Sequence, residues 1–431
     1  MSTRRGKTVF VLKEVILLAG GLGTRLQGVN PHLPKSLAPV AGKAFLSIVI
    51  DALFGHNIDR IILSLSYKAQ DIIHFIADHY PGDSRIQCVV EPKALGTGGA
   101  IKFASQFLSA DRFFALNSDT FFDIDLEGMK SFAVSRNADL VLAAKRMLKP
   151  HRYGTIDIGD NDQIQKFNEK KELDYGWING GVYWMKKSVL NDFVIGDVFS
   201  FEKEILEKKG GNTGLYAYKS DEAFIDIGIP EDYFRAQNWF SSERLQQLRN
   251  QKSNRVLFLD RDGVINVLLP GDYVKNWDEF VFKKDVFEGL RSVNDFFGKM
   301  IIITNQQGIA KGKYTHGDLE QIHLQMKNEL SRQGIEIDGV YFCPHLESEN
   351  CNCRKPKPGM FFYAKQDFPN IDLEQSFFVG DQATDVLAAK AAGIQSIALL
   401  DRAPTDEMKL AMPGATIFSL LELKYLILEK G

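Results

Sequence analysis

Short apolar runs alternate with helix-like segments through the first half of the chain. The runs at 14–20, 60–66 and 112–120 are bounded by turn residues, and segments with apolar residues every three to four positions lie between them. This alternation predicts βαβ units around a parallel sheet. From about Asp139 to Tyr218 the apolar runs become short and closely spaced, so we expect a β-rich part of the same domain there.

A second alternating pattern begins at Arg255 and continues towards the C-terminus. Its apolar runs lie at 255–260, 299–305, 339–343 and 376–381. Each run is followed by a loop and a helical pattern, which predicts a second doubly wound domain. Before it, residues 231–255 have the pattern of a helix that becomes polar and ends without apolar anchors. We therefore predict an α/β protein with two doubly wound domains, at 1–246 and 255–431, and a linker at 247–254.

The composition narrows the class of protein. A chain of 431 residues with 45% hydrophobic and 25% charged residues is typical of globular proteins of two or three domains. The net charge of −3 leaves no basic excess for binding nucleic acid. No stretch approaches the ~20 apolar residues of a membrane span, and the N-terminus lacks a signal-peptide core. Three of the four cysteines lie between Cys343 and Cys353, which favours a metal site in a reducing compartment. We expect a cytoplasmic protein without nucleic-acid or membrane partners.

A glycine-rich turn follows the first apolar run. Gly20, Gly21 and Gly23, with Thr24, would let backbone N–H groups approach an anion at the start of the next helix, and Arg25 adds a charged fork. Alone, such a turn serves equally well to join a strand to a helix. Three further motifs favour a phosphate site. They are PKSL at 34–37, LGTGGA at 95–100 and the strand end NSD at 117–119.

With these motifs the chain resembles the sugar-nucleotide pyrophosphorylase family over about residues 13–240. Within that family the sequences LNSDTFFDIDL, RYGTIDI, NGGVYW and FIDIGIPEDY look most like guanylyltransferases for D-glycero-α-D-manno-heptose 1-phosphate. The resemblance implies a Rossmann-like nucleotidyltransferase domain. It also implies a reaction in which the sugar 1-phosphate attacks the α-phosphorus of GTP and displaces pyrophosphate.

The resemblance assigns roles to individual residues. Asp119 and Asp226 are expected to hold Mg²⁺, Arg25 the leaving phosphates and Lys35 the transferring or incoming phosphate. Fixed cations suit this chemistry because charge develops on phosphoryl oxygens. The expected nucleotide-binding residues are Gly20, Gly21, Gly23, Thr24, Arg25 and Gly96, and the expected sugar-phosphate residues are Gly154, Glu169, Lys170 and Asn179. By itself, the run at 169–171 has the character of a solvated charged segment.

The second half has its own pair of carboxylates. The apolar strand at 256–259 ends in Asp260 and Asp262, and alternation along a strand points both side chains the same way. Two such carboxylates predict a metal site or a shared proton, because their charges repel. Polar residues also end the later strands or precede a helix. They are Thr304, Asp381 with Asp385, and the cations Arg354, Lys355 and Lys357.

These elements, in this order, resemble the haloacid dehalogenase superfamily of phosphatases over about residues 255–400. The resemblance implies that Asp260 attacks phosphorus to form an aspartyl-phosphate. Asp262 then protonates the leaving alcohol and later deprotonates water. Mg²⁺ would be held by Asp260, Asp381 and the backbone carbonyl of Asp262. Thr304 and a lysine would stabilise the transferring oxygens.

The resemblance favours Lys355, because the zinc-containing members of the family place the stabilising lysine directly after the substrate-recognition arginine, here Arg354; Lys357 remains the alternative. The short stretch between Asp262 and Thr304 leaves no room for a large cap domain, so we expect a capless, open site. By the same resemblance, Asn305, Gln306 and the segment 268–273 would contact the substrate.

A cluster of metal-ligand residues precedes these cations. Cys343, His345, Cys351 and Cys353 have the spacing C-x-H-x₅-C-x-C, which fits closed tetrahedral Zn²⁺. With four protein ligands the zinc would be structural and would fix the loop that carries Arg354. This loop resembles that of the D-glycero-D-manno-heptose 1,7-bisphosphate 7-phosphatases and of the related histidinol-phosphate phosphatases, although the spacing from His345 to Cys351 is shorter than in the heptose enzymes.

The two halves favour one common interpretation. Removal of the 7-phosphate from heptose 1,7-bisphosphate yields the 1-phosphate that the first half would activate, a link that a histidinol phosphatase lacks. We therefore expect a bifunctional enzyme that makes GDP-heptose from heptose bisphosphate and GTP, with Mg²⁺ in both sites and structural Zn²⁺. The same reactions on another sugar phosphate, such as mannose 1-phosphate, or with another nucleotide are an alternative. So is a non-catalytic regulatory protein that senses sugar nucleotides, although the intact charged residues disfavour it.

Overall fold

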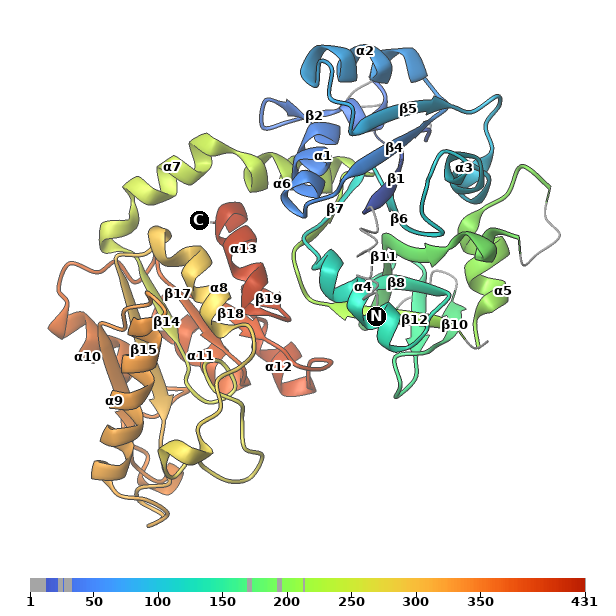
Figure 1. The fold of residues 1–431 in the computed structure, drawn as a ribbon. Coiled ribbons are helices and arrows are strands. Elements are labelled where there is room, and N and C mark those ends of the chain that lie inside the picture. Colours follow the sequence, from blue (N-terminus) through green and yellow to red (C-terminus); the bar gives the residue numbers. More distant parts are fainter. Residues whose placement is uncertain are drawn as a thin grey trace, which may run out of the picture. The chain divides into compact units, whose positions relative to one another are not determined.

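The computed structural model describes residues 13–21, 26, 33–168, 173–191, 196–211 and 214–430. The chain forms two compact units, Met1–Ser241 and Ser242–Gly431, drawn in Figure 1 with sequence colouring. Among the described residues, no helix has the length and apolar character needed to cross a membrane.

Unit 1 is built on a nine-stranded mixed sheet. The strands run in the order β10-β9-β11-β6-β1-β4-β5, and β8 pairs with both β11 and β12. Their bounds are β1 (Glu14–Leu18), β4 (Arg60–Leu65), β5 (Ile86–Val90), β6 (Arg112–Asn117), β8 (Leu140–Leu148), β9 (Thr155–Ile158), β10 (Ile164–Asn168), β11 (Tyr175–Lys186) and β12 (Leu215–Ser220). Strands β1, β4, β5 and β6 are parallel, whereas β11 runs antiparallel to β6 and begins the strand-rich part. The expected change from βαβ units to a β-rich part therefore occurs within one sheet.

Helices and short strands complete unit 1. The helices are α1 (Phe45–Gly55), α2 (Ala69–His79), α3 (Gly96–Ser105), α4 (Leu126–Ser135), α5 (Glu207–Lys209) and α6 (Pro230–Phe240). The short strands are β2 (Pro39–Val40), β3 (Lys43–Ala44), β7 (Thr120–Phe122) and β13 (Phe224–Asp226). Strand β13 pairs antiparallel with β7 and places Asp226 opposite Thr120. This pairing brings two strand-end aspartates, far apart in sequence, to one place.

Unit 2 is a six-stranded parallel sheet in the order β16-β15-β14-β17-β18-β19. Its strands are β14 (Val256–Leu259), β15 (Lys299–Asn305), β16 (Gly339–Cys343), β17 (Phe377–Gly380), β18 (Gln395–Leu399) and β19 (Ala415–Ile417). Alternate residues of β14 enter two different cores: Leu257 and Leu259 lie in one, Val256 and Phe258 in the other. A parallel strand buried on both faces reads as a continuous apolar run, which explains the pattern of 256–259.

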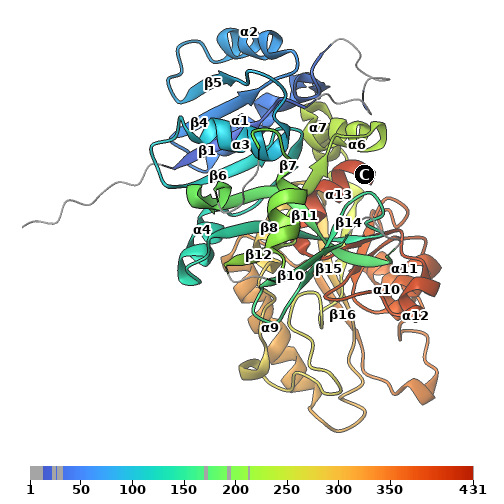
Figure 2. The same ribbon diagram turned by 90° about the vertical axis from the view of Figure 1, so that its right-hand side faces the viewer.

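Helices cover both faces of this sheet (Figure 1, Figure 2). The helices of unit 2 are α7 (Ser242–Asn250), α8 (Val286–Val293), α9 (His316–Arg332), α10 (Gly359–Asp367), α11 (Ala383–Ala391), α12 (Asp406–Ala411) and α13 (Leu423–Lys430). Residues of α7, α8, α9 and α13 fill the first core, and residues of α10 and α11 fill the second. The two doubly wound domains expected from the sequence are present.

The segment between the units differs from the expectation. Residues 231–255 are not one helix: α6 ends before Ser241, whose backbone is extended, and α7 begins at Ser242. The expectation of a polar helix without apolar anchors is wrong, because Leu248 is fully buried and Leu245 packs against the same core of unit 2. Leucines three positions apart lie on one helix face. The expected linker at 247–254 therefore contains the end of a packed helix.

Candidate active sites

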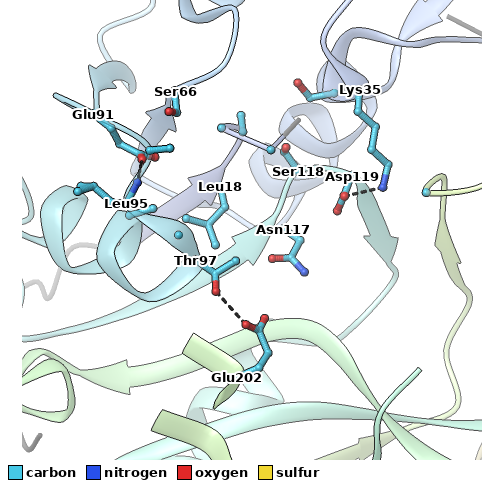
Figure 3. Close-up of a pocket in the computed structure, with 18 residues that line it drawn as sticks. Leu18, Lys35, Ser66, Glu91, Leu95, Thr97, Asn117, Ser118, Asp119 and Glu202 are labelled. Atoms are coloured by element: carbon cyan, nitrogen blue, oxygen red, sulfur yellow. Dashed lines mark hydrogen bonds and ion pairs between the residues drawn. The ribbon is translucent and has the colours of Figure 1, made fainter. Parts of the chain in front are cut away.

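A cavity of about 430 Å³ opens at the carboxyl ends of the parallel strands of unit 1. In parallel α/β sheets this edge is where ligands bind. Figure 3 shows side chains from several segments that surround the cavity. The expected residues that line it are Gly20, Gly21, Lys35, Gly96 and Asp119. Gly23, Thr24 and Arg25, also expected at this site, lie outside the described residues.

The glycines of the second glycine-rich motif permit a close backbone approach. Gly96 has a φ of +72°, and a Cβ atom there would lie 2.6 Å from the carbonyl oxygen of Phe199. The same carbonyl accepts a hydrogen bond of 3.0 Å from the N–H of Gly98. Gly96 thus lines the cavity, while the following glycines let α3 pack against the segment around Phe199. No local pattern in the motif indicates this packing role.

Lys35 joins two carboxylates at the edge of the cavity. Its Nζ lies 2.6 Å from Oδ2 of Asp119 and 3.2 Å from Oδ1 of Asp226. Burial lowers the pKa of Lys35, but the two carboxylates outweigh this effect and raise it overall. Burial, together with the charge of Asp119, raises the pKa of Asp226. Carboxylate oxygens that repel one another are suitable ligands for Mg²⁺, so this pair fits the expected cation.

A second cavity of about 520 Å³ lies on the β-rich side of unit 1. The expected residues Gly154 and Asn179 line it, together with Asp226. Asn179 donates a hydrogen bond of 2.8 Å to the hydroxyl of the buried Tyr183. Glu169 and Lys170 lie outside the described residues.

Two residues line both cavities, Asn117 and Glu202. Glu202 begins a π-helical turn, Glu202–Leu206, and its Oε2 accepts hydrogen bonds from Thr97 at 2.8 Å and Ser200 at 2.9 Å. Figure 3 shows its carboxylate directed at Thr97. Sequence reasoning missed Glu202, because its charged run resembles an ordinary exposed helix; π-helical turns are frequent at functional sites.

Unit 2 has a cavity of about 170 Å³ at the carboxyl ends of its strands. Residues after β14, β15 and β17 converge there, as the motif order implied. The expected residues that line it are Asp260, Asp262, Leu268, Leu269, Asp272, Tyr273, Thr304, Asn305, Lys355 and Asp381. Asp385, noted in the sequence but given no role, also lines this cavity.

The buried Lys355 is the lysine that reaches Asp260. Its Nζ lies 2.8 Å from Oδ1 of Asp260 and 2.6 Å from Oδ1 of Asp385. Lys357 instead donates to the backbone and side-chain oxygens of Asn350, at 2.8 and 2.6 Å. Burial raises the pKa of Asp260 to about 7 despite the opposing charge of Lys355. The structure thus brings one of the two candidate lysines to the expected nucleophile.

Three carboxylates beside Lys355 form a group that could hold a cation. One oxygen from each of Asp260, Asp381 and Asp385 lies within 4.8 Å of the others. Burial and the charge of Asp260 raise the pKa of Asp381 to about 8. Its Oδ1 is buried and accepts no hydrogen bond from the described residues. Three carboxylates that share one ammonium carry an excess of negative charge, which fits a divalent cation such as Mg²⁺.

The side chain of Asp262 does not join this group. Nη2 of Arg261 donates to both carboxylate oxygens of Asp262, at 2.9 Å each, and Asn266 donates a hydrogen bond of 3.0 Å to Oδ1. Burial would raise the pKa of Asp262, but Arg261 and these hydrogen bonds lower it overall. Both side-chain oxygens of Asp262 are therefore engaged within unit 2, and only its backbone carbonyl remains as the expected metal ligand.

The expected substrate contacts of unit 2 separate into two classes. Asn305 lines the cavity and is fixed by hydrogen bonds with the backbone of Lys355, 3.2 and 3.1 Å long. Gln306 is fully buried and does not line the cavity. Arg354 does not line it either, and its buried Nη1 has no hydrogen-bond partner among the described residues.

Three cysteines and one histidine meet after β16. Cys343 Sγ lies 3.6 Å from His345 Nδ1 and 3.5 Å from Cys351 Sγ, and Cys353 Sγ lies 3.3 Å from His345 Nδ1 and 3.4 Å from Cys351 Sγ. A tetrahedral zinc with bonds of about 2.0–2.3 Å would separate its ligands by about 3.6–3.8 Å. The four atoms are close to this spacing, so the cluster fits a closed metal site.

Comparison with known proteins agrees with this division of the chain. Residues 14–243 match the family model described as nucleotidyl transferase, and residues 352–418 match the one described as HAD-hydrolase-like.

Relatives of each half carry different activities. The chain is 39% identical over 221 residues to D-glycero-alpha-D-manno-heptose 1-phosphate guanylyltransferase of Campylobacter jejuni, covering 51% of this chain and 97% of the relative. It is 42% identical over 224 residues to the enzyme of the same name from Aneurinibacillus thermoaerophilus, covering 52% and 96%. Over 153 other residues it is 42% identical to D-glycero-beta-D-manno-heptose-1,7-bisphosphate 7-phosphatase of Helicobacter pylori, covering 35% and 87%. These matches confirm both resemblances that the motifs indicated.

Proposed function

Since the chain belongs to the nucleotidyl transferase family through unit 1 and to the HAD-like phosphatases through unit 2, we propose that it catalyses two consecutive steps of heptose activation. Unit 2 removes the 7-phosphate of D-glycero-D-manno-heptose 1,7-bisphosphate. Unit 1 then transfers a guanylyl group from GTP to D-glycero-α-D-manno-heptose 1-phosphate, which gives GDP-heptose and pyrophosphate.

One observation carries the transferase half of the proposal. Asn117 and Glu202 line both cavities of unit 1, so a nucleotide in one cavity and a sugar phosphate in the other would meet beside Asp119, Lys35 and Asp226. A phosphate oxygen of the sugar forms a bond to the α-phosphorus of GTP. The bond from that phosphorus to the β-phosphate oxygen breaks, and pyrophosphate leaves with the electron pair. Lys35 neutralises charge on the transferring group.

The divalent cation is supported by the carboxylates. Asp119 and Asp226 would hold Mg²⁺, which supplies positive charge against the phosphate oxygens when bound. The same two carboxylates hold the Lys35 ammonium in place. It would lie where the phosphate of the sugar meets the α-phosphate of GTP.

The phosphatase half follows from the residues around Asp260. The Asp260 carboxylate attacks phosphorus, the bond from phosphorus to the sugar O7 breaks, and Asp262 delivers a proton to that oxygen. Water then attacks the aspartyl-phosphate as Asp262 takes its proton, and inorganic phosphate leaves. Lys355 and Thr304 stabilise the transferring oxygens. Mg²⁺ held by Asp260, Asp381 and the backbone carbonyl of Asp262, with Asp385 beside them, would offset the repulsion between the nucleophile and the phosphate. Arg354 remains the proposed residue for substrate recognition.

Zinc in the four-residue cluster would have a structural role. Three cysteines and His345 leave no open position for water, so the metal would fix the loop that leads to Lys355. A metal site built from cysteines suits a reducing compartment, and we place the protein in the cytoplasm.

The two steps can be consecutive only if both units act on the same anomer. The relatives of unit 1 take an alpha 1-phosphate, whereas the phosphatase relatives are named for a beta bisphosphate. The proposal therefore requires that unit 2 accept the α-anomer of the bisphosphate.

Assays of the purified chain with Mg²⁺ test the proposed substrates. Phosphate release is measured from each anomer of the heptose bisphosphate, and pyrophosphate release is measured from heptose 1-phosphate or mannose 1-phosphate with each nucleoside triphosphate. We expect release of phosphate from the α-anomer and of pyrophosphate from α-heptose 1-phosphate with GTP. Faster reaction with mannose 1-phosphate or another nucleotide, or hydrolysis of the β-anomer alone, would contradict the proposal.

A further inference from the structure

Gln306 occupies a place that a substrate contact could not. It directly follows β15, its side chain is fully buried, and it lies outside the set of residues that line the phosphatase cavity. Its backbone N–H donates a hydrogen bond of 2.7 Å to the carbonyl of Cys343. The residue is thus anchored between two neighbouring strands, and its amide must act through other side chains.

The amide of Gln306 contacts Asp262, the expected proton donor, and Thr304, which is expected to bind the transferring phosphoryl group. Its Nε2 lies 2.8 Å from Oδ2 of Asp262 and 2.9 Å from Oγ1 of Thr304. Its Oε1 lies 2.5 Å from the hydroxyl of the buried Tyr314. A glutamine amide offers two hydrogens on nitrogen and an acceptor oxygen, so every polar atom of this side chain is engaged.

The partners fix which way the amide points. The Arg261 guanidinium donates to both oxygens of Asp262 at 2.9 Å, and Asn266 donates to Oδ1 at 3.0 Å, so these oxygens serve as hydrogen-bond acceptors in this arrangement. The atom facing Asp262 must therefore be the NH₂ group, and the oxygen must face Tyr314, whose hydroxyl donates. One NH₂ hydrogen goes to Asp262 and the other goes to Thr304.

This arrangement determines where the Thr304 hydroxyl can donate. Because Thr304 Oγ1 accepts from Gln306, its own hydrogen is left for another acceptor, and the residue lines the cavity beside Asp260. We propose that Gln306 is a positioning residue of the phosphatase site, which orients the Asp262 carboxylate and directs the Thr304 hydroxyl hydrogen towards the transferring phosphoryl oxygen. This inference rests on the proposed phosphatase function.

The experiment compares esters with different leaving groups. The full-length wild-type chain and Gln306→Met, an unbranched side chain without donors, are mixed with heptose 1,7-bisphosphate or with p-nitrophenyl phosphate, and the first turnover is timed. Cleavage of the sugar ester needs a proton from Asp262, whereas p-nitrophenolate leaves without one. We expect the first turnover to fall about a hundredfold for the sugar ester but only about tenfold for the aryl ester, with KM nearly unchanged.

Two further variants keep the test decisive. Tyr314→Phe retains the ring but frees the amide to turn, so the sugar ester should again lose more than the aryl ester, by a smaller factor. Gln307→Met makes the same substitution one position along, at a side chain outside the cavity, and should change neither rate. Equal losses on both esters in Gln306→Met would show a purely structural role, and no loss would exclude any role. If the wild type cleaves neither ester, the proposed phosphatase function fails, and this role fails with it.

Discussion

The ammonium of Lys355 lies 2.8 Å from the carboxylate of Asp260, in a part of unit 2 where both side chains are almost completely buried. A second carboxylate oxygen, Oδ1 of Asp385, lies 2.6 Å from the same ammonium. A buried charge without its partner is strongly unfavourable, so each member of this group depends on the others. The arrangement makes Lys355 the electrostatic centre of the phosphatase site.

Replacing this lysine should abolish phosphate release. In Lys355→Met the nucleophile loses the cation that faces it, and the transferring oxygens lose their stabilising charge. We expect phosphate release from the heptose bisphosphate to fall by about 10³-fold or more. Lys357→Met is the matched control, because Lys357 bonds Asn350 away from the cavity and its loss should change the rate by less than about threefold. Equal losses in the two variants would contradict the assignment.

Lys35 should be as important for nucleotidyl transfer in unit 1 as Lys355 is for phosphate release in unit 2. Lys35→Met leaves Asp119 and Asp226 facing each other without the ammonium between them and removes a cation from the phosphates. We expect pyrophosphate formation to fall by about 10²–10³-fold, while phosphate release by unit 2 stays near the wild-type rate. Lys43→Met, at an exposed lysine of β3, serves as the control in the same assay. A Lys35 variant that retains full transferase activity would contradict the role proposed here.

The sequence anticipated the strand-end residues better than the side chains behind them. Asp119, Asp260, Thr304 and Asp381 each follow a buried strand, and parallel strands deliver their carboxyl ends to one edge, so their convergence could be foreseen. Asp385 and Glu202 reach their sites through side-chain directions that depend on the surrounding packing. The spacing after Asp381 points to Asp385 without giving it a role, and no local pattern distinguishes Glu202 from an ordinary helix position.

Packing decides two features that local patterns do not specify. The resemblance assigns Gln306 to the substrate, whereas its side chain is fully buried with its amide bonded to Asp262, Thr304 and Tyr314. The segment 231–255 is expected to become polar because, after Phe240, Leu245 and Leu248 are its only strongly apolar residues. Two leucines suffice once a core lies beside them, and the sequence does not specify which core that is.

The packing of α7 can be tested by truncating its buried anchor. Leu248→Ala should destabilise unit 2 by about 2–5 kcal/mol, because it leaves a cavity in a fully buried position. The free energy of unfolding of unit 2 is measured by chemical denaturation, with phosphate release as the probe of the folded state. Gln246→Ala, on the exposed side of α7, should cost less than about 0.5 kcal/mol. Equal stability of the two variants would show that α7 is not anchored in unit 2.

The cysteine cluster predicts a selective effect of metal removal. We expect about one equivalent of zinc per chain, and strong chelation should lower the thermal stability of unit 2, because the metal contributes folding free energy. Cys351→Ser should have the same effect, whereas Cys88→Ser, in β5 of unit 1, should leave the zinc content unchanged. Less than about half an equivalent of zinc in the wild type would contradict a tetrahedral site.

The charges around the cavity on the β-rich side of unit 1 favour removal of the 7-phosphate before nucleotidyl transfer. Arg152 lines this cavity, but its guanidinium already pairs with Asp232 at 2.6 Å, and Lys203 on the rim is exposed. Among the described residues that line this cavity, a phosphate dianion at the far end of the sugar would therefore find no preorganised counter-charge, and an unpaired charge binds poorly. Heptose that still carries its 7-phosphate should be a poor acceptor of the guanylyl group.

The most direct test of the two-step account uses Asp260→Asn, which removes the nucleophile of unit 2 and leaves unit 1 unchanged. This variant is supplied with heptose 1,7-bisphosphate, GTP and Mg²⁺, and pyrophosphate is measured. The account predicts slow pyrophosphate formation and no phosphate release, and it predicts that added heptose 1-phosphate restores the wild-type rate. Pyrophosphate that forms from the bisphosphate as fast as in the wild type would contradict the account, since the phosphatase step would then not precede nucleotidyl transfer.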